Sequence, residues 1–393
     1  MQLENLLLAL LRFEFFGKDL TETERQDLLG LGEEESKKLF ILSKKHDMAH
    51  VVGRALTRND IITVENPLYQ QYGKEQMLSV YGYENQKHEL KNIRRVFNIS
   101  GVPFVVLKGS TIRKLYPLPE LRSSCDIDVL IKREDVNKAK HLLFSELRYT
   151  EEERASLHDV TLHTQTDVTI ELHYSLQEGI SPMDEVLNKV WGYTTDVDDI
   201  YVDQSYEKEL TGAFALFYLV AHTAYHFVNG GCGIKPFVDL LFMQEKIPYD
   251  NDQLDDLLKR SNLKTFYESM VKIAKSWFMS EESDEIVDLA KEYILTGGVY
   301  GTTDNAIAVK RAKNISKSGY FWSRIFMPYE SLKNLYPVLN KHKWLFPFCQ
   351  VARWFRALFG GKSKKFAKEL KVSANVTQDQ TEKLSKLFKN VGL

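Results

Sequence analysis

The sequence predicts an α+β protein in which a small mixed β-sheet is flanked by helical N-terminal and C-terminal regions. Apolar residues recur at helical spacing over residues 1–98. Short β-branched runs then alternate with helical patterns over residues 99–205, and the helical signal returns over 206–393. We therefore expect a sheet-containing core over 99–205 between two helical regions.

The N-terminal region begins with leucines, among them Leu3 and Leu7, at positions that share one face of a helix. Thr21 followed by Glu24 has the spacing of a capping box, which predicts the start of a second helix. A longer helix is expected over residues 68–98, where it would lead into the core.

Two features of the first part of the core predict a strand, a turn and a helix. Residues 102–107 form a short apolar run that stops at Lys108-Gly109-Ser110, as a buried strand ending in a turn does. A helix over 110–116 is expected to follow. Glycine after a strand lets the backbone approach a phosphate closely, while Lys108 offers a positive charge and Ser110 a hydroxyl.

The rest of the core predicts three strands. Residues 126–131 alternate acidic and aliphatic side chains, which indicates a strand with one polar face. A helix over 134–147 follows, and then two strands over 157–165 and 168–174. Thr166-Asp167 would be the turn that joins these two strands into a hairpin.

The most informative residues of the core are its acids. On a strand, Asp126 and Asp128 point to the same face, about 6.6 Å apart along the backbone. At an effective dielectric constant of about 20, their charges repel by about 2.5 kcal/mol, and a divalent cation between them reverses the sign of that energy. Glu171, on a later strand that also exposes His173, would complete a three-carboxylate metal site. Such a site can hold two Mg²⁺ ions, with Mn²⁺ as the alternative.

Longer segments around these residues resemble a known family. LKGSTIRKLYP, LRSSCDIDVLI and IELHYSL are similar to segments of a bacterial nucleotidyltransferase family within the DNA polymerase beta-like superfamily, and two C-terminal segments, MPYESLKNLYPVL and KWLFPFCQVARWFR, extend the likeness over about residues 85 to 360. The resemblance implies a mixed sheet flanked by helices, the use of magnesium and an NTP, and transfer of a nucleoside monophosphate. The gap between Ser110 and Asp126 is slightly longer than the superfamily's usual one, which weakens the assignment of Ser110.

The resemblance also implies roles for single residues. Asp126 and Asp128 would bind metal, and Glu171 would complete the site or act as a base. Arg122 matches an arginine that precedes the acidic strand and could contact phosphate with both arms of its guanidinium, or else lie on the surface. His173 could orient the substrate, or else be a packed or capping histidine.

Residues of the C-terminal region admit several interpretations. His222 and His226 share one helical face. They could be metal ligands, residues that line a substrate pocket, or histidines of the core or of a helix end. The glycine-containing loop 229–233 could lie over the site, with Lys235 reaching toward phosphate and Asp239 on the next helix. A plain turn with solvated charges is the alternative.

Composition narrows the class of protein. The 52 basic and 54 acidic residues nearly cancel, so there is no strong nucleic-acid-binding signal, and three scattered cysteines predict neither a disulfide framework nor a cysteine-rich zinc site. No stretch of about 18 apolar residues predicts a membrane span, and Glu4 and Arg12 make the N-terminus unlike a secretory signal, so we expect a cytoplasmic location. The apolar segment 344–359 with its arginines could lie on an anionic membrane surface, but we expect it to pack on the core.

The expected activity is therefore metal-dependent transfer of an NMP from an NTP to an acceptor, with release of pyrophosphate. The sequence leaves open the base of the NTP and the acceptor, which could be a sugar, another small molecule, a protein side chain or an RNA end. Two alternatives remain at this point: an Asp-x-Asp glycosyltransferase, and a non-catalytic nucleotide-sensing or scaffold protein on the same fold.

Overall fold

Helices form the N-terminal part of the chain. The computed structural model describes residues 2–152, 158–197, 205–299 and 377–393, together with short stretches between 301 and 359. The N-terminal helices are α1 (Leu3–Phe16), α2 (Glu22–Leu29), α3 (Glu33–Lys45), α4 (Ala49–Arg58) and α5 (Tyr69–Ile99). The predicted capping box is present at the start of α2, where the Glu24 amide donates to Thr21 Oγ1 and the Thr21 amide donates to Glu24 Oε2.

The sheet is mixed and is built from strands that lie far apart in the chain. Its strands are β1 (Phe104–Val106), β2 (Asp126–Ile131), β3 (Thr150–Glu151), β4 (Asp159–His163), β5 (Thr169–His173), β6 (Thr194–Asp196) and β7 (Glu207–Leu210). Their order across the sheet is β3-β4-β5-β2-β1-β7-β6. β2 pairs with β5 in parallel and with β1 antiparallel, and β4 and β5 form the predicted hairpin.

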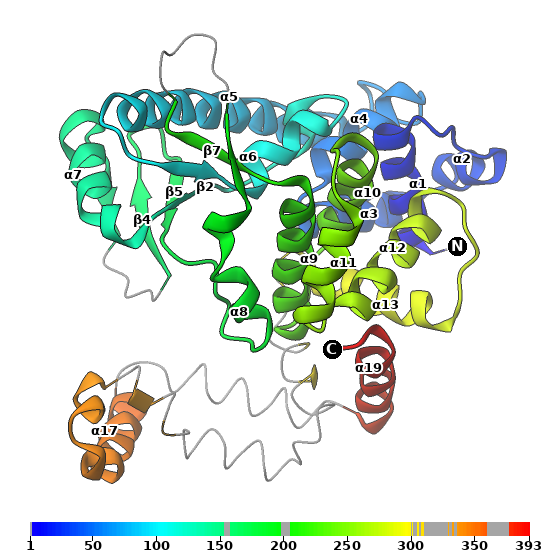
Figure 1. The fold of residues 1–393 in the computed structure, drawn as a ribbon. Coiled ribbons are helices and arrows are strands. Elements are labelled where there is room, and N and C mark those ends of the chain that lie inside the picture. The colour runs from blue at the N-terminus through cyan, green and yellow to red at the C-terminus, as the bar shows by residue number, and fades with distance from the viewer. Residues whose placement is uncertain are drawn as a thin grey trace.

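Helices connect and cover the strands. Those within the sheet region are α6 (Lys108–Ile112), α7 (Val136–Leu147) and α8 (Met183–Leu187), and the C-terminal ones are α9 (Gly212–Val228), α10 (Lys235–Lys246), α11 (Asn251–Arg260), α12 (Lys264–Phe278), α13 (Glu285–Gly297), α17 (Phe346–Phe359) and α19 (Gln378–Val391). Short 3-10 turns lie at Arg113–Leu115, Pro119–Leu121, Arg133–Asp135, Val190–Tyr193, Pro337–Asn340 and Lys343–Leu345. Figure 1 shows α5 running along the sheet toward the N-terminal helices, with α9 to α13 gathered beside the sheet. Among the described residues no helix is both long and apolar enough to cross a membrane.

The two faces of the sheet pack into different cores. Phe104, Ile127 and Val129 belong to an apolar cluster that α5 and α7 cover. Val105 and Leu130 are each one residue along the strand from these and so point to the opposite face of the sheet. They belong to the larger cluster formed with the N-terminal and C-terminal helices. Because strand side chains alternate between faces, the acids of β2 that are in phase with Leu130 point toward the helical side, where the cavity described below lies.

Three expectations need correction. The region over 206–393 was expected to be helical, but β7 occupies residues 207–210 near its start, before α9 begins at Gly212. This strand forms by parallel pairing with β1 about a hundred residues earlier, which local periodicity does not reveal. The helix expected from Ser110 begins at Lys108 and gives way to a 3-10 turn at Arg113.

The third correction concerns the apolar C-terminal segment, which was expected to pack on the main core. Among the described residues, Cys349 of α17 is buried in a separate small cluster with Leu332 and Leu339. Trp344 and Phe348 nearby are largely exposed, at 68% and 65%.

Candidate active site

The acids predicted from the sequence meet on neighbouring strands. In the parallel pairing of β2 and β5, Asp128 lies opposite Glu171, and Asp126 lies opposite Thr169. Asp128 is buried, whereas Asp126 and Glu171 are half-buried. All three line a cavity of about 410 Å³ between the sheet and α9. The side-chain alternation of two strands thus gathers the acids on one wall.

His173 lies closer to the paired acids than Asp126 does. Its Nε2 is 2.9 Å from Asp128 Oδ1 and 3.4 Å from Glu171 Oε2. Asp128, Glu171 and His173 each offer one potential metal-ligand atom, and these three atoms all lie within 4.8 Å of one another. This spacing allows a shared metal ion. Asp126 stands outside this group, and its Oδ1 accepts a hydrogen bond of 3.0 Å from Ser124 Oγ.

Burial and neighbouring charges shift the pKa values of Asp126, Asp128 and His173. Burial, together with the neighbouring Asp128 and Glu171 carboxylates, raises the pKa of Asp126 to about 6. Burial acts in the same direction on Asp128, but the Lys108 ammonium and the hydrogen bond from His173 outweigh it and leave that pKa below its usual value. Burial lowers the pKa of His173, yet its hydrogen bonds to the two acids raise it to about 9.

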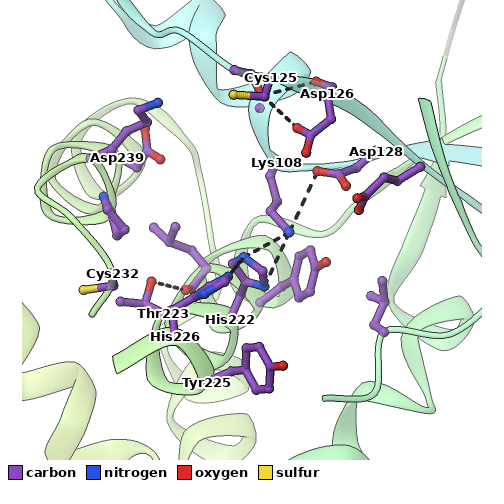
Figure 2. A pocket seen from close by; sticks show the side chains of 18 of the residues that line it. Lys108, Cys125, Asp126, Asp128, His222, Thr223, Tyr225, His226, Cys232 and Asp239 are labelled. Carbon is purple, nitrogen blue, oxygen red and sulfur yellow. Dashed lines mark hydrogen bonds and ion pairs between the residues drawn. The ribbon is translucent and has the colours of Figure 1, made fainter. Parts of the chain in front are cut away.

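Lys108 joins the two sides of the cavity. Its Nζ is 3.8 Å from Asp128 Oδ2 and 3.2 Å from His222 Nε2, and it lies 5.4 Å from the centre of the Tyr218 ring. Figure 2 shows this side chain reaching between Asp128 and the imidazole of His222. The Lys108 backbone has a φ of 22°, a strained value for a residue with a side chain. The lysine is therefore held at this spot by its surroundings.

Side chains crowd against Gly109, which lies in the first turn of α6 directly after β1. A Cβ at Gly109 would lie 2.8 Å from Ser124 Oγ and 3.2 Å from the NH1 of Arg122. Arg113 Nε donates to the Gly109 carbonyl at 3.2 Å, and Gln86 Nε2 of α5 donates to the Ser124 carbonyl at 2.8 Å. The guanidinium of Arg113 also donates to the Gln86 side chain, so α5 fixes both segments of the wall.

Ser110, by contrast, does not line the cavity, although Lys108 and Gly109 do. The helix begins at Lys108, so that Ser110 already lies inside it. The structure thus brings two of the three residues of the Lys108-Gly109-Ser110 turn to the site.

Arg122 lies at the cavity but is already paired. Its Nε and NH2 donate to the two carboxylate oxygens of Asp239 at 2.8 and 2.7 Å, and Tyr116 Oη donates to the same carboxylate at 2.7 Å. Both charged side chains are buried. The bidentate phosphate contact expected of Arg122 would require this pair to separate, so the structure does not place its guanidinium as the sequence predicted.

Lys235 reaches the cavity from the start of α10 and is also paired. Its Nζ donates to Asp47 Oδ2 at 2.9 Å and to the Ser123 carbonyl at 2.7 Å. Burial raises the pKa of Asp47, but the Lys235 ammonium outweighs it and leaves that pKa below its usual value. Asp47 comes from the turn between α3 and α4, so the N-terminal region contributes to the cavity wall.

The wall opposite the acids carries a chain of hydrogen bonds. Glu178 Oε1 lies 2.9 Å from His222 Nδ1, and His222 Nε2 lies 2.9 Å from His226 Nε2. Burial, together with the nearby His222 and the Lys108 ammonium, lowers the pKa of His226 to about 3. Burial and Lys108 likewise hold the pKa of His222 well below its usual value. Of the interpretations left open for the two histidines, the structure supports the lining of a pocket.

The chain matches one family of known proteins. Residues 32–279 match the model of a family described as an uncharacterised nucleotidyltransferase. None of the curated proteins or solved structures compared with the chain gave a match. The family match spans well over half of the chain and includes both β2 and β5, the strands that carry the acids. This protein therefore belongs to that nucleotidyltransferase family.

Proposed function

We propose that this chain transfers a nucleoside monophosphate from an NTP to an acceptor, releases pyrophosphate, and depends on a divalent metal. The observation that carries the proposal is the pairing of Asp128 with Glu171 across β2 and β5, on the wall of a cavity and beside Asp126. Family membership supplies the reaction class.

The residues present fit a divalent cation. Asp128 and Glu171 offer the hard oxygen atoms that Mg²⁺ prefers, and Asp126 stands within the same cavity for a second ion. The nitrogen of His173 in the closest group is a donor that Mn²⁺ also accepts, so we keep Mn²⁺ as the alternative. Bound metal would neutralise charge on the oxygens of the α-phosphate and of the leaving pyrophosphate.

Lys108 and Gly109 are the proposed phosphate-binding residues. Lys108 contacts Asp128 only at 3.8 Å, so its ammonium can exchange this partner for a phosphate oxygen without breaking a close ion pair. Gly109 lets the backbone come close to the phosphates. We assign His173 to orientation of the Asp128 and Glu171 carboxylates or to the metal itself.

The proposed reaction is an in-line displacement at the α-phosphorus. The acceptor oxygen forms a bond to phosphorus while the bond to the bridging oxygen of pyrophosphate breaks, and the electron pair leaves with pyrophosphate. The proton of the acceptor passes to a carboxylate of the wall, for which Asp126 and Glu171 are the candidates.

The two alternatives left open by the sequence can be weighed. Family membership favours nucleotidyl transfer over a glycosyltransferase. A non-catalytic nucleotide-binding protein would bind NTP without turnover, so it differs from the proposal in an experiment. We keep the division into 1–98, 99–205 and 206–393 as a proposal, with the qualification that Asp47 of the first unit lines the cavity.

The proposal is tested by calorimetric titration of the protein with each NTP in the presence and absence of Mg²⁺. We expect binding of one or more NTPs that requires Mg²⁺ and that weakens at least tenfold in Asp128→Asn. Asp256→Asn is the matched control, because Asp256 is 59% exposed on α11 and does not line the cavity. Equal binding by both variants, or binding that ignores Mg²⁺, would count against the proposal.

A further inference from the structure

The cavity wall formed by α9 and by the segment between β5 and α8, called the α9 wall below, has a different chemistry from the acidic wall. Glu178, His222 and His226 form one hydrogen-bonded chain, and all three line the same cavity as Asp126 and Asp128. Two Nε2 atoms 2.9 Å apart require one donor and one acceptor, so at least one of the imidazoles is neutral. This wall therefore presents at least one neutral imidazole and one carboxylate.

Charge pairing argues against an anionic ligand on this wall. Among the described residues that line the cavity, Arg122 and Lys235 are held in close ion pairs with Asp239 and Asp47, and Lys108, the remaining cation, is assigned above to the phosphates of the NTP. A phosphate placed on the α9 wall would instead meet the Glu178 carboxylate. An uncharged ligand carries no such repulsion.

Ring geometry argues against a nucleobase there. Tyr218 and His222 are inclined at 51°, His222 and His226 at 77°, and Tyr225 and His226 at 74°. None of these ring pairs is parallel, so they do not form a slot that would sandwich a flat base. The hydroxyl and imidazole groups of these cavity-lining residues instead suit a ligand with several hydroxyl groups.

We infer that Glu178, His222 and His226 form the acceptor subsite of this enzyme, and that the acceptor is an uncharged small molecule bearing several hydroxyl groups. The inference rests on the proposed nucleotidyl transfer and names the substrate that this activity modifies. Lys108 contacts both Asp128 and His222, so a hydroxyl bound at the histidines lies next to the reacting phosphate. The acceptor oxygen bonds to the α-phosphorus, pyrophosphate leaves, and the hydroxyl proton goes to a carboxylate of the acidic wall.

The test uses the full chain, Mg²⁺, and each NTP labelled on the α-phosphorus. Matched probes are offered as acceptors: glycerol beside glycerol 3-phosphate, glucose beside glucose 6-phosphate, and inositol beside inositol phosphate. Glu178→Gln and His226→Asn are compared with wild type. The control variants are Glu152→Gln and His163→Asn, which alter a glutamate–histidine pair that is 48% and 46% exposed.

We expect label transfer to an uncharged member of a pair, with a KM for that acceptor raised about tenfold in Glu178→Gln and in His226→Asn, as the loss of a hydrogen bond predicts. The Mg²⁺–NTP dissociation constant, measured by calorimetry, should stay within about twofold of wild type in both variants, and thermal unfolding confirms that each is folded. The two control variants should match wild type in both measurements.

Three results would overturn the inference. They are transfer only to phosphorylated probes, transfer to neither member of any pair by a protein that binds Mg²⁺–NTP, and weakening of Mg²⁺–NTP binding by tenfold or more in Glu178→Gln or His226→Asn. Failure of the wild-type protein to bind any Mg²⁺–NTP would instead remove the proposed function itself, so the two failures are distinguishable.

Discussion

Two of the basic–acidic pairs that border the cavity, Arg122–Asp239 and Lys108–Asp128, differ in how firmly they are held. Arg122 makes two hydrogen bonds of 2.7 and 2.8 Å to Asp239, which Tyr116 also contacts. Lys108 approaches Asp128 only to 3.8 Å and shares its ammonium with His222. Both basic residues were predicted to bind phosphate. A basic residue beside the site can therefore belong to a fixed structural pair or to an exchangeable one, and the geometry of the pair distinguishes the two.

The largest expected effect follows from breaking the firm pair. Arg122→Ala would leave the buried Asp239 carboxylate without its cation, so we expect the free energy of unfolding to fall by about 3–5 kcal/mol. Urea denaturation measures this loss. A fall below about 1 kcal/mol would show that the pair is not the structural element that its geometry indicates.

Replacing both members of that pair tests whether an uncompensated charge or lost packing causes the loss of stability. An Arg122→Met, Asp239→Leu protein removes both charges together, so it should recover most of the stability lost in Arg122→Ala. The same urea denaturation gives the result. If the double variant were as unstable as the single one, the loss would come from packing and not from an uncompensated charge.

Lys108→Met is expected to lower activity more than stability. Loss of an ammonium that stabilises charge on the phosphates should lower kcat/KM for pyrophosphate release about 100-fold, equivalent to about 2.7 kcal/mol. The free energy of unfolding should fall by less than in Arg122→Ala, because the contact with Asp128 is long. Lys259→Met, which alters a 61% exposed lysine of α11, is the control. Stability loss comparable to that of Arg122→Ala would erase the distinction between the two pairs.

A smaller effect than that of Arg122→Ala is expected at Tyr116, whose hydroxyl contacts the carboxylate of the Arg122–Asp239 pair. Tyr116→Phe removes the hydroxyl that donates to Asp239 Oδ1 at 2.7 Å, while the arginine remains. Loss of one hydrogen bond to a charged group should cost about 1.5 kcal/mol of unfolding free energy. Because the cavity side of the pair is unchanged, Mg²⁺–NTP binding should stay at the wild-type level, which calorimetry would show.

Local patterns in the sequence were sufficient for the strands that carry the acids. The alternation around Asp126 and Asp128 fixed β2 at its actual bounds, and the alternation around Glu171 placed that residue on the same face as His173. These features depend on side chains a few residues apart. For the same reason the hairpin turn at Asp167 could be predicted, where φ is 59°.

Contacts between distant segments could not be read from such patterns. Lys235 meets Asp47 across 188 residues, and Arg122 meets Asp239 across 117. Nothing near Arg122 in the sequence marks it as paired, and nothing near Asp47 marks it as part of the cavity. The parallel pairing of β1 with β7 was missed for the same physical reason. The cytoplasmic location and the identity of the metal stay predictions.

The central claim is that the acids gathered by β2 and β5 perform metal-dependent nucleotidyl transfer. Its most direct test incubates wild type and an Asp126→Asn, Asp128→Asn protein with each α-labelled NTP, Mg²⁺ and the acceptor probes named above, and measures pyrophosphate release and label transfer. We predict Mg²⁺-dependent release and transfer by wild type that the double variant loses, while its far-ultraviolet circular dichroism remains that of the wild-type fold. Equal activity in a folded double variant would contradict the account.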